Sequence, residues 1–406
     1  MNKPIIIAIT GTKGKTSTAR LIDFVLNQLG YRTLRVDSDG CFLNNKNIKT
    51  RKDSQRVYKK PPTVKSGKYL YLANRNNTDY AILEQSISSG KLENGLGYKE
   101  HDFSIFTNVY SDHIDYKIIK NSEDIYRLKL NILKKTKKNS WLIINYDNKY
   151  GKKLSEAVKI NNKILFYGYS EKLLQCSDYL RAESDIININ YKGLNYKVDI
   201  KTLSFPFNLD FKPAIYNLMA SLGLLILLDI KISLILKALK NFTQNNFYGR
   251  LILKKFKGRK ILFDTAHEHV SIIETAKLCK KIGKNLTGVL RVSPERTNRY
   301  IRLLAKKIAL ANIFDKLIIY DFIDGITRNE SISKVNGKTR KVGETANIFT
   351  KGLKLYNYKN IKIETVLNEQ KALEKTLESS EKNDVILFIH HKLKKDLSYL
   401  KKLSSS

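Results

Sequence analysis

The first twenty residues of this chain constrain its fold more than any other segment. Residues 5–10 read Ile-Ile-Ile-Ala-Ile-Thr and predict a short buried strand, and residues 18–29 have the apolar periodicity of a helix. Between them stands a glycine-containing loop with a Lys-Thr pair, which in this strand–loop–helix context is typical of phosphate binding. We therefore expect phosphates to bind at Gly11, Thr12, Lys13, Gly14, Lys15, Thr16 and Ser17.

Two side chains of this loop have separate expected roles. Main-chain N–H groups of the loop and of the helix N-terminus would point at the phosphates. Lys15 is expected to reach the β- and γ-phosphates of a nucleotide, and Thr16 to offer its hydroxyl to Mg²⁺. The sequence therefore predicts a site for ATP and Mg²⁺, and a chance Gly-Lys-Thr turn is the alternative.

Short apolar strands alternate with helical segments along the whole chain, which predicts a doubly wound α/β fold. A second alternating set begins near Leu251, so we place a domain boundary within residues 247–250. The expected domains are an ATP-binding domain over residues 1–246 and a smaller Rossmann-like α/β domain over residues 247–406. The expected strands are Ile5–Ile9, Tyr80–Leu83, Phe103–Thr107, Trp141–Ile144, Ile164–Tyr167, Ile261–Phe263, Leu286–Leu290, Lys316–Tyr320 and Val385–Ile389.

Composition bounds the partners and the compartment. The formal net charge of +36 has two interpretations: the coding bias of an AT-rich genome, or an acidic partner. No segment matches a nucleic-acid-binding module, and the apolar run Leu218–Ile230 is too short to span a bilayer. Three widely spaced cysteines indicate a reducing compartment, so we expect a cytoplasmic protein without disulfides.

Further chemistry-bearing side chains follow two of the expected strands. Glu84 comes at the end of one strand, where residues of an open α/β sheet line the ligand crevice, and is a candidate Mg²⁺ ligand. His113 follows the next strand between Asp112 and Asp115, which suits a metal ligand oriented by a carboxylate; a turn histidine is the alternative. Lys129 lies on a helix about fifteen residues later, either folded back onto the site or as a solvated lysine.

These motifs together resemble the Mur ligase superfamily of ATP-dependent amide-forming ligases. The likeness rests on G-T-K-G-K-T-S at residues 11–17, on T-N-x-x-x-D-H-x-D-Y at residues 107–116, and on the helix that carries Y-x-x-K at residues 126–129. The resemblance implies that Glu84 and His113 bind Mg²⁺. It also implies that Lys129 is carbamylated by CO₂ and becomes an anionic group beside the metal.

The same resemblance extends beyond the first half of the chain. Asn217 stands where the family has an asparagine that contacts adenine. Arg250 stands in a Gly-Arg pair whose arginine reaches the ATP phosphates, and Asp264 in a turn that holds the ribose. These three residues are therefore expected to bind the nucleotide.

A narrower likeness is to the Mur-ligase-like half of the cyanophycin synthetase family. It rests on Ser-Asp-Gly at residues 38–40 and on the run from Glu84 to Tyr98, which ends in Gly-Leu-Gly-Tyr. Capsular poly-γ-glutamate synthases, which have a similar length, are the close alternative. Both likenesses imply a ligase that joins an amino acid to an acidic amino-acid or peptide acceptor through an acyl phosphate, with a separate ligase subunit as a possible partner.

Two hypotheses from other classes remain open at this point. A P-loop switch or transport ATPase would use the same loop without an amino-acid acceptor, and a polyanion-binding scaffold would carry a decayed ligase site. The presence of Lys15, Thr16, Glu84 and His113 argues against both. The sequence does not identify the amino acid, the acceptor or the oligomeric state.

Overall fold

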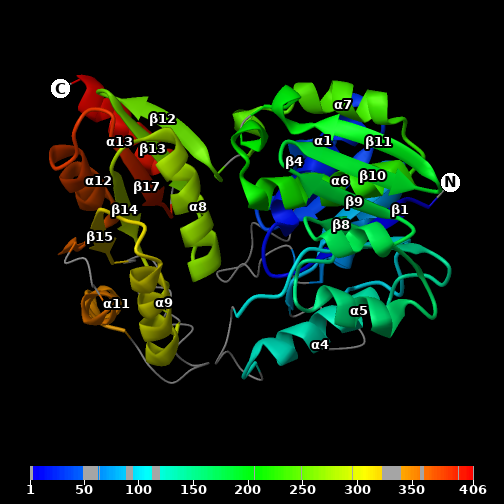
Figure 1. The fold of residues 1–406 in the computed structure, drawn as a ribbon, viewed down its shortest axis with the longest axis horizontal. Coiled ribbons are helices and arrows are strands. Elements are labelled where there is room, and N and C mark those ends of the chain that lie inside the picture. Colours follow the sequence, from blue (N-terminus) through cyan, green and yellow to red (C-terminus); the bar gives the residue numbers. More distant parts are fainter. Residues whose placement is uncertain are drawn as a thin grey trace. The chain divides into compact units, whose positions relative to one another are not determined.

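The computed structural model divides into two compact units, residues 1–246 and 247–406. Each unit is built on its own β-sheet and is described by itself (Figure 1). The residues that the structure describes are 3–48, 63, 65–87, 95–111, 119–204, 206–247, 249–294, 296–321, 340–356, 361–391 and 393–405.

The first unit contains an eleven-stranded sheet in the order β11-β10-β9-β8-β7-β6-β1-β5-β2-β3-β4. The strands from β9 to β2 in this order are parallel to their neighbours, and antiparallel strands extend both edges. Their bounds are β1 Ile5–Thr10, β2 Thr33–Asp37, β3 Gly40–Leu43, β4 Lys46–Asn47, β5 Tyr80–Glu84, β6 Phe103–Phe106, β7 Trp141–Asn145, β8 Lys163–Gly168, β9 Tyr179–Glu183, β10 Ile186–Tyr191 and β11 Leu194–Asp199.

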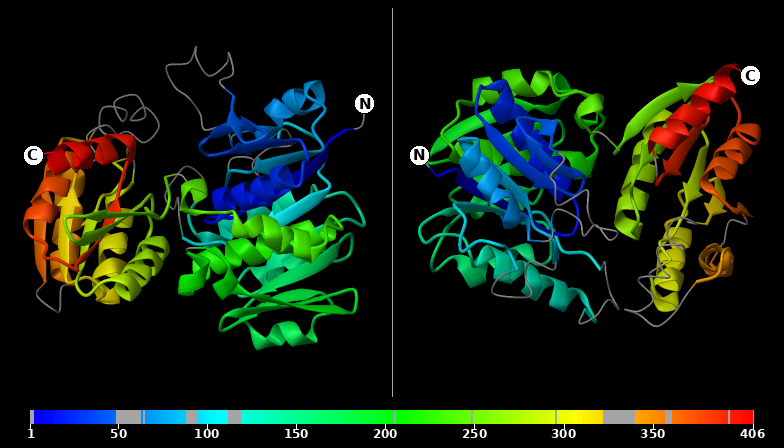
Figure 2. Two further views of the ribbon diagram at one scale, coloured as in Figure 1. Left: turned by 90° about the horizontal axis from the view of Figure 1, so that it is seen from above. Right: turned by 180° about the vertical axis from the view of Figure 1, so that it is seen from behind.

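Helices cover both faces of this sheet (Figures 1 and 2). On one face α1 packs against α6 and α7, and on the other α4 packs beside α5. Helix α6 is largely apolar and almost wholly buried, which is typical of a core helix. The helices are α1 Lys15–Gln28, α3 Leu70–Arg75, α4 Ser122–Leu133, α5 Gly151–Val158, α6 Lys212–Leu227 and α7 Ile232–Lys240, with 3₁₀ turns at Ser66–Tyr69, Glu171–Gln175, Ile200–Thr202, Phe207–Leu209 and Gln244–Phe247.

The second unit contains a six-stranded sheet in the order β12-β13-β17-β14-β15-β16. Only β12 is antiparallel to its neighbour. Helices α8, α9 and α11 lie on one face, and α12 and α13 on the other (Figure 1). The bounds are β12 Ile252–Phe256, β13 Arg259–Asp264, α8 His269–Ile282, β14 Leu286–Leu290, α9 Asn298–Ala311, β15 Lys316–Tyr320, α11 Glu344–Leu355, β16 Lys362–Val366, α12 Glu369–Glu378, β17 Val385–Ile389 and α13 Leu393–Ser405.

The predicted α/β fold class is confirmed, and every expected strand is present to within one or two residues. The reason is that the central strands of both sheets are buried on both faces and therefore appear in the sequence as short continuous apolar runs. Among the described residues, no helix is long and apolar enough to cross a membrane.

Candidate nucleotide and magnesium site

The loop between β1 and α1 depends on two glycines. Gly11 has φ +146° and Gly14 has φ +86°, a region that glycine enters at little cost. A Cβ atom at Gly11 would overlap the Thr107 hydroxyl, and one at Gly14 would overlap the Asn217 side-chain oxygen. The backbone therefore passes too close to its neighbours for any other residue, and the N-terminus of α1 opens directly beside Asn217.

The end of the neighbouring strand β6 holds the loop in shape. The Thr12 N–H donates to the Asn108 carbonyl oxygen at 2.8 Å, and the Lys13 N–H donates to Asn108 Oδ1 at 2.8 Å. The Thr107 hydroxyl donates to the Lys13 carbonyl at 2.6 Å, and the Tyr110 N–H donates to the Thr12 hydroxyl at 3.1 Å. The Thr-Asn pair, noted in the sequence only as part of a motif, thus serves as the mechanical support of the loop.

Glu84 meets the loop from the other neighbouring strand, β5. The Thr16 hydroxyl donates to Glu84 Oε2 at 2.8 Å, and Lys15 Nζ lies 3.7 Å from Glu84 Oε1. The Ser38 hydroxyl donates to Oε1 at 2.9 Å and the Ser38 N–H to Oε2 at 3.2 Å. Glu84 is only 3% exposed, and three hydrogen bonds and one ion pair, from α1 and from the turn after β2, hold this carboxylate at the N-terminus of α1.

The donor set at this point suits a hard divalent cation. A hydroxyl from Thr16 and a carboxylate from Glu84 lie side by side, and such oxygens are the ligands that Mg²⁺ prefers. His113, the other expected metal ligand, lies outside the described residues, as do its flanking aspartates. Within the described ranges, no group of three or more His, Cys, Asp and Glu side chains forms a metal cluster.

Lys129 is not a solvated surface lysine. It lies on α4 and is only 2% exposed, which makes it one of the largest fully buried side chains of the described chain. A capping box starts this helix: the Asn121 side chain accepts from main-chain N–H groups of the first turn, and Asp124 accepts from the Asn121 N–H. Burial of a lysine requires partner groups, which agrees with a role other than solvation.

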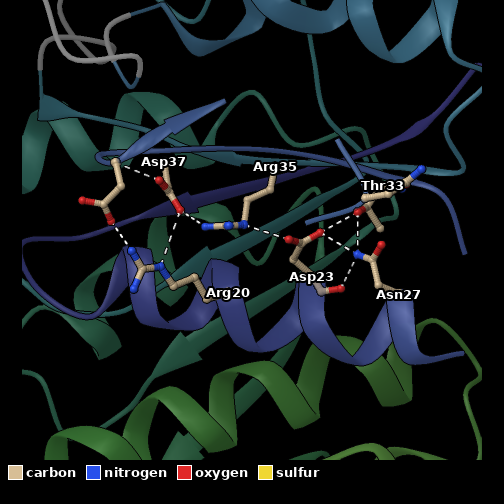
Figure 3. A network of polar contacts seen from close by, with 8 residues as sticks. Arg20, Asp23, Asn27, Thr33, Arg35 and Asp37 are labelled. Carbon is tan, nitrogen blue, oxygen red and sulfur yellow. Dashed lines mark hydrogen bonds and ion pairs between the residues drawn. The ribbon is translucent and has the colours of Figure 1, made fainter. Parts of the chain in front are cut away.

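A buried ionic network joins α1 to β2 (Figure 3). Arg35 Nε donates to Asp23 Oδ2 at 2.8 Å, and the same guanidinium pairs with Asp37. Arg20 Nε lies 3.9 Å from Asp37. Burial raises the pKa of Asp37 to about 6, with Asp39 and Glu84 raising it and the two arginines lowering it. The network ties the end of β2, and hence Ser38, to α1.

A chain of hydrogen bonds starts at Gln85, one residue after Glu84, and leads to Ser104 on β6. Gln85 Nε2 donates to the Tyr98 hydroxyl at 2.8 Å, and this hydroxyl lies 3.4 Å from His101 Nδ1. His101 Nε2 lies 2.7 Å from the Ser104 hydroxyl, which in turn lies 2.7 Å from the Thr136 hydroxyl. The Thr136 hydroxyl donates to a main-chain carbonyl, so every donor in the chain points the same way. Burial lowers the pKa of His101 to about 3, so this histidine is a neutral structural residue.

The remaining expected nucleotide residues lie in both units. Asn217, on α6, accepts from the Thr18 hydroxyl at 3.4 Å and lies over Gly14. Asp264, at the end of β13, is 8% exposed and accepts from the Thr275 hydroxyl at 3.3 Å. Arg250 follows the boundary of the second unit and donates its N–H to the Phe247 carbonyl at 2.8 Å. The structure thus brings Asn217 to the loop, while Arg250 and Asp264 belong to the second unit.

This combination of strand, loop and supporting residues has a counterpart among known proteins. The profile of the Mur ligase middle domain family matches residues 9–225, which is more than half of the chain. The chain belongs to the Mur ligase family. The matched range includes the loop, Glu84, Asn108, Lys129 and Asn217, so the resemblance predicted from the motifs is confirmed.

The chain is similar to two kinds of curated relatives. One is UDP-N-acetylmuramoyl-L-alanyl-D-glutamate–2,6-diaminopimelate ligase of Clostridium botulinum, to which the chain is 27% identical over 347 residues. This alignment covers 80% of this chain and 67% of that ligase. The chain is 25% identical over 403 residues to a cyanophycin synthetase of Geminocystis herdmanii, covering 94% of this chain and 42% of the synthetase. The chain therefore spans about two-fifths of the length of this synthetase.

Solved structures of the family share the fold. MurF ligase from Thermotoga maritima, determined in complex with ADP, superposes with a TM-score of 0.64 at 15% identity. The superposition covers 99% of this chain and 81% of that chain. Both units of this Mur ligase family member thus have the family's architecture.

Proposed function

We propose that this protein is an ATP-dependent ligase that joins a carboxylate to an amine. A substrate carboxylate oxygen attacks the γ-phosphorus of ATP and ADP leaves, which forms an acyl phosphate. The amine nitrogen of an amino acid then attacks the acyl carbon, and phosphate leaves as the amide forms. The observation that carries this proposal is the convergence of Lys15, Thr16 and Glu84 at the N-terminus of α1 within a Mur ligase family domain.

The first unit is proposed to hold the nucleotide and the metal. Lys15 and the loop N–H groups would stabilise the charge that develops on the transferred phosphoryl oxygens, which is the main catalytic demand of phosphoryl transfer. Thr16, Glu84 and His113 would hold Mg²⁺, which supplies charge neutralisation between the phosphates. We further propose that Lys129 carries a carbamate near this metal.

The nucleotide's other groups are assigned to three residues from the family resemblance. Asn217 is proposed to contact adenine, and its position over Gly14 of the loop supports that role. Arg250 is proposed to bind phosphate and Asp264 to accept hydrogen bonds from the ribose hydroxyls. We propose residues 247–406 as the domain that selects the amino acid.

The substrates are proposed to be an amino acid and an acidic amino-acid or peptide acceptor, as in a cyanophycin synthetase-like ligase. The net charge of +36 supports an anionic acceptor, because a strongly cationic protein raises the local concentration of anions. If this steering operates, KM for a short aspartate or glutamate peptide will rise with salt, since exposed charges are screened beyond about 8 Å at physiological ionic strength. A KM that ignores ionic strength would remove the argument from charge.

A screen for ATP-dependent phosphate release tests the proposed activity. It combines the protein with Mg²⁺, bicarbonate and each of the twenty amino acids, with and without short aspartate or glutamate peptides. Lys15→Ala is the blank, and Lys159→Ala, an exposed lysine after α5, is the matched control. Release that needs one amino acid and one carboxylate supports the ligase; equal release without an acceptor identifies a switch or transport ATPase instead.

A further inference from the structure

His390, at the end of β17, contacts three parts of the second unit. Its main-chain N–H donates to the Asp264 carbonyl at 2.9 Å, and its carbonyl accepts from Arg291 Nη2 at 3.3 Å. Its ring nitrogen Nε2 lies 3.0 Å from the carbonyl oxygen of Gly249. The side chain is only 3% exposed, so these contacts are shielded from water.

The partner of the ring fixes its protonation state. A main-chain carbonyl only accepts, so Nε2 of His390 must carry the hydrogen that Gly249 accepts. Burial lowers the pKa of His390, and the neighbouring charges of Arg291 and Arg250 lower it further, while the Gly249 hydrogen bond and Asp264 raise it. The ring is therefore a neutral Nε2–H imidazole at neutral pH, with Nδ1 as a buried acceptor.

Gly249 stands at a point where the backbone turns sharply. Its φ is +74°, and the next residue, Arg250, closes a turn with its N–H on the Phe247 carbonyl at 2.8 Å. The Gly249 carbonyl belongs to the peptide unit that leads into Arg250, so a donor on that oxygen restricts the direction in which Arg250 leaves the turn. The Arg250 N–H and the Gly249 carbonyl are the two polar groups of this one peptide unit, so Phe247 and His390 together hold both of them at a glycine whose backbone is otherwise permissive.

We propose that His390 is a positioning residue for nucleotide binding, which fixes Arg250 through its Nε2–H on Gly249 and Asp264 through its main-chain N–H. This inference rests on the proposed function, in which Arg250 and Asp264 bind the phosphate and the ribose. His390 then contacts the backbone of both groups, through its imidazole at the turn into Arg250 and through its main chain, whatever its side chain, at Asp264. His390 itself touches neither the nucleotide nor the reacting atoms.

A matched pair of substitutions separates this role from a general contribution to packing. Glutamine places an amide nitrogen near the position of Nε2 and keeps the donor, whereas asparagine is too short and replaces only Nδ1. In the full-length protein, His390→Asn is expected to weaken MgADP binding about tenfold, the value of one buried hydrogen bond, and His390→Gln to restore it to within about threefold of wild type. KM for ATP should follow the same order, while kcat changes less.

Several outcomes would overturn the inference. Equal MgADP affinity of wild type, His390→Asn and His390→Gln would show that the Gly249 contact positions nothing. If Arg250→Ala weakens binding and His390→Asn does not, the nucleotide role of Arg250 stands and the inference fails. If the wild type itself does not bind MgADP, the proposed function fails first.

Nitrogen NMR of the histidine-labelled protein supplies a test that does not depend on nucleotide binding. The His390 signal, assigned by its loss in His390→Gln, is expected to show the Nε2–H neutral tautomer across neutral pH. An Nδ1–H tautomer, or a ring that is charged at neutral pH, would contradict the hydrogen bond to Gly249.

Discussion

Replacing Arg35 with methionine should destabilise the first unit strongly. Asp23 and Asp37 are both fully buried, and Arg35 is the cation that they share. Without it, Asp23 keeps only the neutral donors of Thr33 and Asn27. Asp37 keeps the Asp39 N–H and the more distant Arg20 at 3.9 Å. Removing one partner of a buried ion pair costs about 3–5 kcal/mol, because a buried charge is left without compensation. For a unit of this size that corresponds to a loss of roughly 6–20 °C in Tm.

The assay follows urea unfolding by the fluorescence of Trp141. This is the single tryptophan of the chain and lies on β7, so its signal reports the first unit. Arg32→Met is the matched control, because Arg32 forms an ion pair with Asp79 at 3.7 Å at the surface. The Arg32 side chain is 54% exposed and the Asp79 side chain 41%. Such exposed pairs contribute less than about 1 kcal/mol. An Arg35→Met protein as stable as Arg32→Met would refute the view that the network stabilises this unit.

The pH dependence of this effect has a definite sign. Asp37 has a pKa raised to about 6 in the folded protein, so the folded state binds more protons than the unfolded state between about pH 4 and 6. The stability contributed by this group therefore falls as pH rises through that window and levels off above it. Arg35 lowers the pKa of both aspartates, so its removal raises both further. The deficit of Arg35→Met should be smaller at about pH 5 than at about pH 8.

Three further predictions concern the candidate site. Gly14→Ala should weaken MgADP binding at least tenfold, because alanine in this left-handed φ costs about 1–2 kcal/mol and its Cβ would overlap Asn217. Unchanged MgADP affinity in a binding titration would contradict this prediction. Ser38→Ala should lower kcat about tenfold through a less fixed Glu84 and leave the thermal midpoint nearly unchanged; an unaltered kcat would show that Ser38 does not position this carboxylate. Lys129→Ala should abolish turnover and its stimulation by bicarbonate, and a variant that bicarbonate still activates would exclude the carbamate.

The sequence predicts well those parts of the fold whose residues are close together in the chain. The strand, the glycine loop and the helix over residues 5–29 are adjacent in the chain, and the run of apolar residues and the two glycines suffice to predict them. Glu84 follows from the rule that ligands bind beyond the carboxyl ends of parallel strands, whereas Asp264 is predicted from the family resemblance. The structure places both at such ends.

The residues that sequence reasoning misses act through contacts between distant positions. Ser38 lies 46 residues from Glu84, and Asn108 lies 95 residues from the Lys13 that it supports. His390 lies 141 residues from Gly249. None of these pairings follows from spacing or periodicity, because each depends on which strands become neighbours in a sheet.

The central claim is that a substrate carboxylate is activated by phosphorylation before the amide forms, and an isotope-transfer experiment tests it most directly. The acceptor that supports phosphate release is prepared with ¹⁸O in its reacting carboxylate, and the phosphate released with ATP, Mg²⁺ and the amino acid is analysed by mass spectrometry. One ¹⁸O atom in each phosphate, formed in step with the amide product and absent with Lys15→Ala, is the predicted result. Phosphate without ¹⁸O, whose fourth oxygen then comes from water, would show that ATP is simply hydrolysed and would contradict the account.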